Sequence, residues 1–196
     1  MGLLLSLNKF EFFFFDEVKS LEFTMNILFA LVLILFAAFS RLIPHAPNFT
    51  PVISIALFAG AYLQRRFAFL VPIVAMLMSD LIIGFYSPVS MLFVYGSLLL
   101  TVGLGMVMNK KVSLVKIAGF SFVGAVLFFV LTNFAMWIVP NSIYPRTFSG
   151  LVECYVMAIP FFGNTVYSAL IYSAMMFGMY ELVGRFVFKT KTAIEE

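Results

Sequence analysis

Between two strongly apolar runs, the chain reads Arg41-Leu-Ile-Pro-His-Ala-Pro-Asn-Phe-Thr-Pro51. Each proline removes a backbone donor and biases the preceding residue away from helical geometry, so this stretch cannot form a regular helix. The apolar run that follows, Val52–Leu63, would be about 18 Å long as a helix, against a hydrocarbon core of roughly 30 Å. In a membrane, part of the irregular stretch would therefore lie at membrane depth. Non-helical backbone survives there only when protein buries it or it lines a water-filled cavity.

The composition places the chain among integral membrane proteins. It is 63% hydrophobic and 11% charged, whereas soluble domains average about 25% charged residues. One cysteine excludes an internal disulfide, and one cysteine with one histidine excludes a His/Cys metal cage, so we predict neither a bound metal nor a cofactor. Nothing in the sequence indicates a nucleic-acid partner.

The apolar runs predict an all-α bundle of six transmembrane helices. The second span is short or broken, and an irregular outer segment precedes it. Between the fifth and sixth spans lie a polar connection, Pro140–Gly150, and a nine-residue apolar piece, Leu151–Ile159, that Pro160 ends before it can cross the membrane. The six predicted spans are Asn26–Ile43, Val52–Leu63, Phe67–Phe85, Val89–Met108, Leu114–Val139 and Phe161–Gly184.

The chain ends fall outside this predicted domain. Residues 1–24 mix apolar clusters with charged side chains, and we interpret them as an N-terminal extension with Met25 as an alternative start, or as a membrane-surface helix. The transmembrane domain is predicted over 25–184, and a basic tail covers 185–196. Ten of the twelve Lys and Arg residues fall on the side of the termini, which leaves only Arg41 and Arg146 on the other. Because cytoplasmic loops retain Lys and Arg, both termini are predicted to be cytoplasmic, in the inner membrane.

Polar side chains gather near the predicted outer ends of the spans. Intramembrane charges such as Asp80 are costly and usually face a bundle interior or a cavity, paired with another group. We therefore predict one outward-facing pocket for a small zwitterionic or carboxylate-bearing solute with an aromatic or heterocyclic part. The predicted substrate-binding residues are Arg41, His45, Asn48, Asp80, Asn133, Trp137, Tyr144 and Arg146.

Enzyme motifs are missing, so we do not predict catalysis. The sole imidazole is His45, and no Gly-x-Ser-x-Gly elbow or phosphate-binding loop is present. Two carboxylates sharing a proton would require Glu153 beside Asp80, without any flanking motif. A membrane enzyme that uses Asp80, and a structural membrane subunit without a ligand, remain the alternatives from other classes.

Several motifs resemble an uncharacterised family of bacterial multi-pass membrane proteins to which transport is ascribed. The resemblance covers about Met25 to Gly184, and that family is similar to the S components of energy-coupling factor (ECF) vitamin transporters. It implies that the chain binds a vitamin-like solute outside and then topples within a membrane scaffold driven by separate ATPases. The motifs are the Arg41–Pro51 stretch, Ala56-Leu-Phe-Ala-Gly-Ala61, Ser79-Asp80-Leu, Thr132-Asn133-Phe134, Tyr144-Pro-Arg-Thr147, Cys154-Tyr155 and Pro160-Phe-Phe-Gly-Asn164.

The first span departs from the pattern of those relatives. S components commonly present an Ala-x-x-x-Ala face for docking their scaffold, whereas here Ala30 is followed at i+4 by Ile34, and Ala37 by Arg41. The sequence therefore leaves a solitary transporter as an alternative to a subunit with scaffold and ATPase partners. A narrower version of the solitary transporter takes a corrinoid whose cobalt meets Cys154 or His45.

Overall fold

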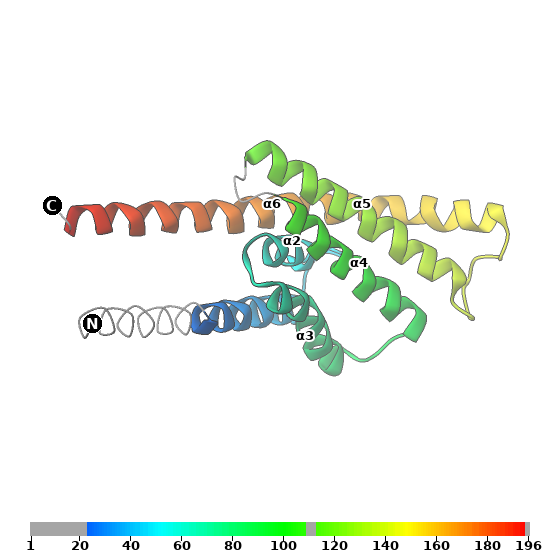
Figure 1. Cartoon of the computed structure of the whole chain (residues 1–196). Helices are drawn as coiled ribbons and strands as arrows, with labels where there is room; N and C mark the ends of the chain where they lie inside the picture. Colours follow the sequence, from blue (N-terminus) through cyan, green and yellow to red (C-terminus); the bar gives the residue numbers. More distant parts are fainter. Residues whose placement is uncertain (1–22, 109–112, 195–196) are drawn as a thin grey trace, which may run out of the picture.

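The structure of the protein is a computed structural model that describes residues 23–108 and 113–194, with side chains described as far as Leu182. The described residues form six helices and no strand (Figure 1). The predicted N-terminal extension lies outside these residues up to position 22. The helices are an N-terminal helix Phe23–Leu42, α2 Val52–Tyr62, α3 Arg65–Ile83, α4 Pro88–Val107, α5 Leu114–Ile138 and α6 Phe148–Ile194.

Five of these helices are long and apolar enough to cross a membrane, and α2 is the shorter apolar helix. The prediction of a helical, multi-pass membrane protein with a short second helix is thereby confirmed within the described residues. The boundaries of the first five helices lie within three residues of the predicted spans. The start of the N-terminal helix and the C-terminal end of α6 lie toward one end of the bundle, and the α5–α6 connection lies at the other (Figure 1).

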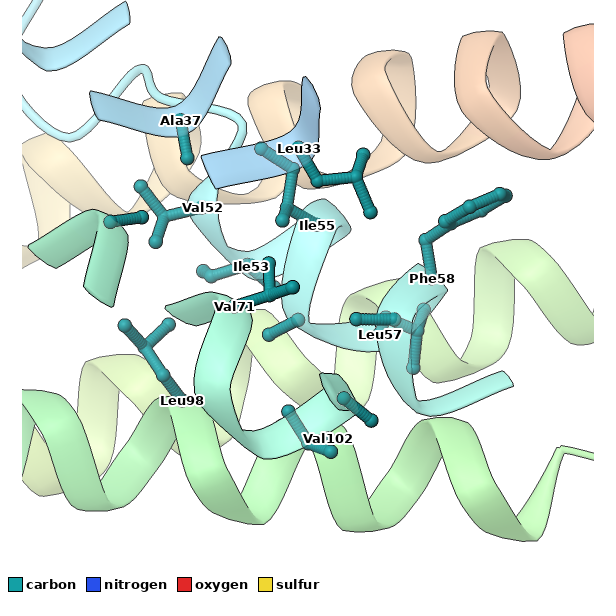
Figure 2. Close-up of a cluster of buried hydrophobic side chains, with 14 of the residues drawn as sticks. Leu33, Ala37, Val52, Ile53, Ile55, Leu57, Phe58, Val71, Leu98 and Val102 are labelled. Atoms are coloured by element: carbon teal, nitrogen blue, oxygen red, sulfur yellow. The ribbon is translucent and has the colours of Figure 1, made fainter. Parts of the chain in front are cut away.

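Helix α2 forms the centre of the bundle. Its 11 residues are apolar on nearly every face, and a helix of that kind is stable only when it is buried on all sides. Every residue from Val52 to Gly60 is buried, and α2 packs against α3, α4, α5 and α6. Its one hydroxyl on that buried stretch, Ser54 Oγ, donates to Ala169 O of α6 at 2.9 Å. Figure 2 shows its side chains among residues of neighbouring helices: Leu33, Ala37, Val71, Leu98 and Val102.

Two glycines allow the backbones of α2 and α4 to touch. A Cβ on Gly60 would collide with the carbonyl oxygen of Val102, and a Cβ on Gly105 would collide with the carbonyl oxygen of Leu57. Both obstacles are backbone atoms, which cannot rotate away as a side chain can. Small residues at a membrane helix interface permit this close approach, and it fixes the position of α2 along α4.

The irregular stretch before α2 is held in place by α6. The side chain of Asn164 donates to Pro47 O at 3.0 Å, and Ser168 Oγ donates to Asn48 O at 3.4 Å. A turn closed by Phe49 N and Ala46 O, 2.9 Å apart, reverses the chain direction. These bonds satisfy backbone carbonyls that the prolines keep out of a helix.

Asn48 lies in the left-handed region, with φ of 62°. Asparagine and glycine adopt this conformation readily, whereas a β-branched residue there is strained by about 1–2 kcal/mol. We therefore expect Asn48→Gly to leave the free energy of unfolding almost unchanged and Asn48→Val to lower it by at least about 1 kcal/mol. Unfolding in mixed micelles measures both, and equal stabilities of the two variants would contradict the assigned conformation.

Helix α6 corrects one prediction. The apolar piece Leu151–Ile159 and the predicted sixth span form one continuous helix, Phe148–Ile194, with Pro160 inside it. A proline there removes one helical donor, to the carbonyl of Val156, but leaves the other bonds in place. Prolines are tolerated in membrane helices because neighbouring groups can satisfy the freed carbonyl. The backbone helix also continues past Gly184, the predicted end of the domain, to Ile194.

Candidate functional site

A cavity of about 260 Å³ lies among the helices of the bundle. It is bordered by the C-terminal end of the first helix, the irregular stretch, the N-terminal end of α2, and side chains of α3 to α6. Its mixed lining combines a charged and several polar groups with an apolar wall. The lining residues are Arg41, His45, Asn48, Thr50, Val52, Ile53, Met76, Tyr86, Val94, Leu98, Phe128 and Thr165.

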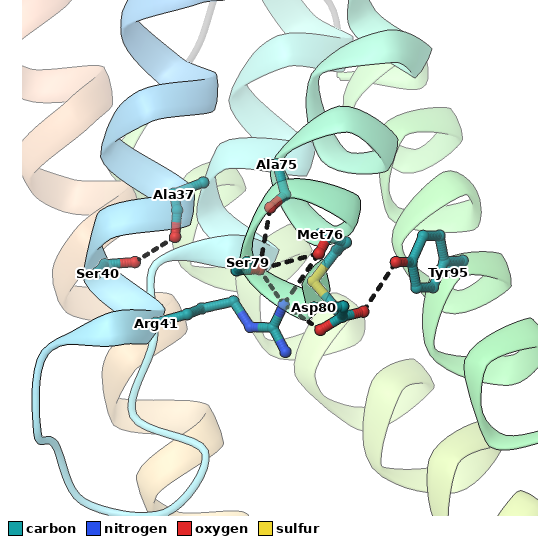
Figure 3. Close-up of polar contacts among 8 residues, drawn as sticks. All are labelled: Ala37, Ser40, Arg41, Ala75, Met76, Ser79, Asp80 and Tyr95. Carbon is teal, nitrogen blue, oxygen red and sulfur yellow. Dashed lines mark hydrogen bonds and ion pairs between the residues drawn. The ribbon is translucent and has the colours of Figure 1, made fainter. Parts of the chain in front are cut away.

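A buried ion pair lies at the edge of the cavity (Figure 3). Arg41 Nη1 is 2.8 Å from Asp80 Oδ1, and the two side chains are 17% and 1% exposed. The other carboxylate oxygen, Oδ2, accepts a hydrogen bond of 2.8 Å from the Tyr95 hydroxyl of α4. Because one end of the first helix, α3 and α4 all contribute a group, the pair ties three helices together. It matches the expectation that an intramembrane charge has a partner.

Ser79 holds the same guanidinium group from the neighbouring position of α3. Arg41 Nη1 donates to Ser79 Oγ, and the same nitrogen lies 3.4 Å from Met76 O. Ser79 Oγ is itself anchored to Ala75 O and Met76 O, at 3.0 and 2.9 Å. All the described polar contacts of Arg41 are therefore made by one terminal nitrogen, Nη1.

His45 and Asn48 enter the cavity from the irregular stretch. His45 Nδ1 lies 2.6 Å from Ile43 O. Since a carbonyl oxygen only accepts, Nδ1 carries the hydrogen, and Nε2 is left without a described partner. The side chain of Asn48 likewise has no described partner. The exposed position of both residues fits contact with solvent or a solute.

Tyr86 reaches the cavity from the connection between α3 and α4. Burial and, to a smaller extent, the charge of Asp80 raise the pKa of its hydroxyl, Arg41 opposes the rise, and the resulting pKa is about 12. The hydroxyl therefore stays protonated at neutral pH and keeps one O–H donor. No described residue accepts a hydrogen bond from it.

Three of the predicted site residues lie elsewhere, at the C-terminal end of α5 and in the α5–α6 connection. Trp137 Nε1 donates to Pro145 O at 2.9 Å, and Arg146 Nη2 donates to the carbonyls of Ile138 and Val139 at 2.8 and 3.0 Å. A basic side chain on the last carbonyls of a helix is a common C-terminal cap. Tyr144 belongs to the same turn, and its amide donates to Ser142 Oγ at 3.2 Å. Trp137, Tyr144 and Arg146 thus close the end of α5 and do not line the cavity.

Asn133 also lies outside the cavity lining. Its side chain donates to Phe129 O of the same helix at 2.7 Å. The buried thiol of Cys154 donates to Asn133 O at 3.4 Å, so it lies against α5 and not beside His45 in the cavity. Within the described residues, no group of three His, Cys, Asp or Glu side chains could hold a metal ion.

The chain was compared with known protein families, curated proteins and solved structures. Residues 21–192 match DUF6580, a family of unknown function. The chain belongs to DUF6580. No curated protein and no solved structure matches the chain, so transport and the resemblance to ECF S components stay predictions.

Sequence reasoning missed several groups at the site of this DUF6580 chain. Tyr95 and Ser79 complete the ion pair, and Tyr86 and Thr165 line the cavity. A tyrosine in the apolar span after Asp80 was the available signal, because a buried carboxylate needs donors. Depth along a span was readable from the sequence, whereas the direction in which each side chain points around its helix was not.

Proposed function

We propose that this DUF6580 protein binds a small vitamin- or cofactor-like solute in the Arg41 cavity, on the outer side of the membrane, and takes part in its uptake. The observation that supports this proposal most directly is the cavity itself, placed next to the buried Arg41–Asp80 pair. Ionisable groups inside a membrane are expensive, usually face the bundle interior or a cavity, and often mark solute or ion pathways.

The short helix α2 supports the same reading. Transporters commonly build their binding sites from discontinuous helices whose ends lie inside the membrane. Here the irregular stretch and the first residues of α2, Val52 and Ile53, form part of the cavity wall. The volume of about 260 Å³ is close to the lower end of ligand pockets, roughly 300 Å³, which favours a small solute.

The mode of coupling belongs to the proposal as well. We propose an ECF-type arrangement, with a membrane scaffold and ATPases as partners, on the strength of six helices and the sequence motifs; a solitary transporter is the alternative. We propose binding without catalysis, because the described partners of Asp80 are Arg41 and Tyr95 and no second carboxylate. Glu153, the carboxylate that an acid pair would need, is exposed.

A ligand screen on purified protein tests the proposal. A compound present at a hundred times its dissociation constant should add about 2.7 kcal/mol to the free energy of unfolding. We expect one compound from a panel of vitamins, cofactors and their precursors to raise the melting temperature of the wild type.

A cavity-filling variant provides the matched control. Val94→Phe places a ring in the cavity lining of α4 and should abolish the stabilisation. Leu92→Phe adds the same ring to the same helix at a side chain that is 70% exposed, and it should leave the stabilisation intact. Stabilisation that persists in Val94→Phe would mean that the solute binds outside this cavity.

A further inference from the structure

If the proposed function holds, the chemical groups that line the cavity indicate which class of solute binds there. Arg41 is the starting point, because only one edge of its guanidinium group is occupied. Nη1 contacts Asp80, Ser79 and Met76, whereas Nη2 and Nε have no described partner. In Figure 3 all the dashed lines that reach Arg41 end on one terminal nitrogen. The free edge is the planar fork that binds a carboxylate with two parallel hydrogen bonds.

The N-terminus of α2 is a second source of donors at the same cavity. Its N-cap is Pro51, which makes no side-chain capping bond. The first amides of a helix have no partner within the helix, and none of the amides of Val52, Ile53 and Ser54 has a described acceptor. Val52 and Ile53 are 7% and 5% exposed, and both line the cavity. Buried amides at the positive end of a helix dipole attract an anion.

The rest of the lining is consistent with an anion and supplies no competing charge. No carboxylate lines the cavity, and Asp80 is turned to Arg41 and Tyr95. The Tyr86 hydroxyl and the two hydroxyls of Thr50 and Thr165 add polar groups. The remaining lining side chains are apolar and include an aromatic ring: Val52, Ile53, Met76, Val94, Leu98 and Phe128.

From these contacts we infer that the cavity takes a monocarboxylic acid with an apolar or aromatic body. The carboxylate is held by the free edge of Arg41 and by the first amides of α2, and the body lies against the apolar wall. Asp80 acts as a positioning residue, because it fixes the guanidinium group from the side that the solute does not use. This inference rests on the proposed function and names its substrate class.

Matched acid and amide pairs test the inference with compounds of one shape and different charge. The probes are benzoate with benzamide, nicotinate with nicotinamide, biotin with biotinamide, and lipoate with lipoamide. Binding is measured by thermal shift and by equilibrium titration of the purified full-length protein. We expect at least one acid to bind at least tenfold more tightly than its amide, a difference of about 1.4 kcal/mol.

Asn48→Asp tests the same point from the protein side. It adds a carboxylate to the cavity wall without changing the shape of the side chain, and aspartate tolerates the φ of 62° as asparagine does. We expect the variant to melt like the wild type, to bind the acid at least tenfold more weakly and to bind the amide unchanged. Arg41→Lys, which retains the charge but not the fork, should lose the preference for the acid.

The outcomes separate the two proposals. If acid and amide bind equally, or if Asn48→Asp weakens both alike, the carboxylate inference is wrong and the solute-binding function stands. If no probe of either kind binds, while the wild type melts cooperatively, both proposals are overturned for this class of compound.

Discussion

Asp80→Ala is expected to lower the free energy of unfolding by about 3–5 kcal/mol, the cost of removing one partner from a buried ion pair. The remaining charge of Arg41, whose side chain is 17% exposed, would then be left without its counter-ion. The Tyr95 hydroxyl would lose its acceptor at the same time. Reversible unfolding in mixed micelles measures the loss.

Two further variants separate the charge from the packing. Tyr95→Phe keeps the ion pair and removes one hydrogen bond to a charged group, so about 1.5–3 kcal/mol should be lost. The double variant Arg41→Leu/Asp80→Leu removes both charges. It should recover most of the stability lost in Asp80→Ala, because replacing a buried ion pair by apolar residues of similar size often leaves the free energy of unfolding unchanged or raises it. A double variant no more stable than Asp80→Ala would mean that the loss comes from packing and not from the unpaired charge.

Most helix boundaries could be predicted from the sequence. The apolar runs and their breaks predict five of the six helices closely, because proline and basic residues mark span ends in the chain itself. Pro160 is the exception. The sequence shows that a helical donor is missing at that position, but not whether the surrounding structure tolerates the loss. Local signals place helix ends, and only packing decides whether a proline ends a helix or lies within it.

The cavity-lining residues that come from one continuous segment could be predicted from the sequence. Arg41, His45 and Asn48 come from the single irregular stretch, and all three line the cavity. Trp137 and Arg146 have a similar predicted depth, yet they close the end of α5, because depth does not define the position around the bundle. Partners that lie on different helices, such as the tyrosine on Asp80, depend on helix rotation and crossing, which a single sequence does not encode in a readable form.

Gly60→Ala and Gly105→Ala are each expected to cost at least about 3 kcal/mol, the upper end of the range for overpacking. The added methyl group on Gly60 meets the carbonyl of Val102, and the one on Gly105 meets the carbonyl of Leu57. Neither obstacle can rotate away, so α2 and α4 must separate, and the buried contacts along α2 are lost with them. Unfolding in mixed micelles and thermal melting measure the effect.

Gly103→Ala is the matched control, in the same helix and two residues from Gly105. A Cβ there meets nothing within 4 Å, so the variant should gain about 0.5–1 kcal/mol from helix propensity. The double variant Gly60→Ala/Gly105→Ala should lose clearly less than the sum of its parts, because both methyl groups push apart the same two backbones and the second enters a gap already opened. Full additivity would mean that the two glycines act at independent contacts. Subadditivity would support the view that one backbone contact fixes α2 along α4, and with it the position of the cavity-lining residues Val52 and Ile53.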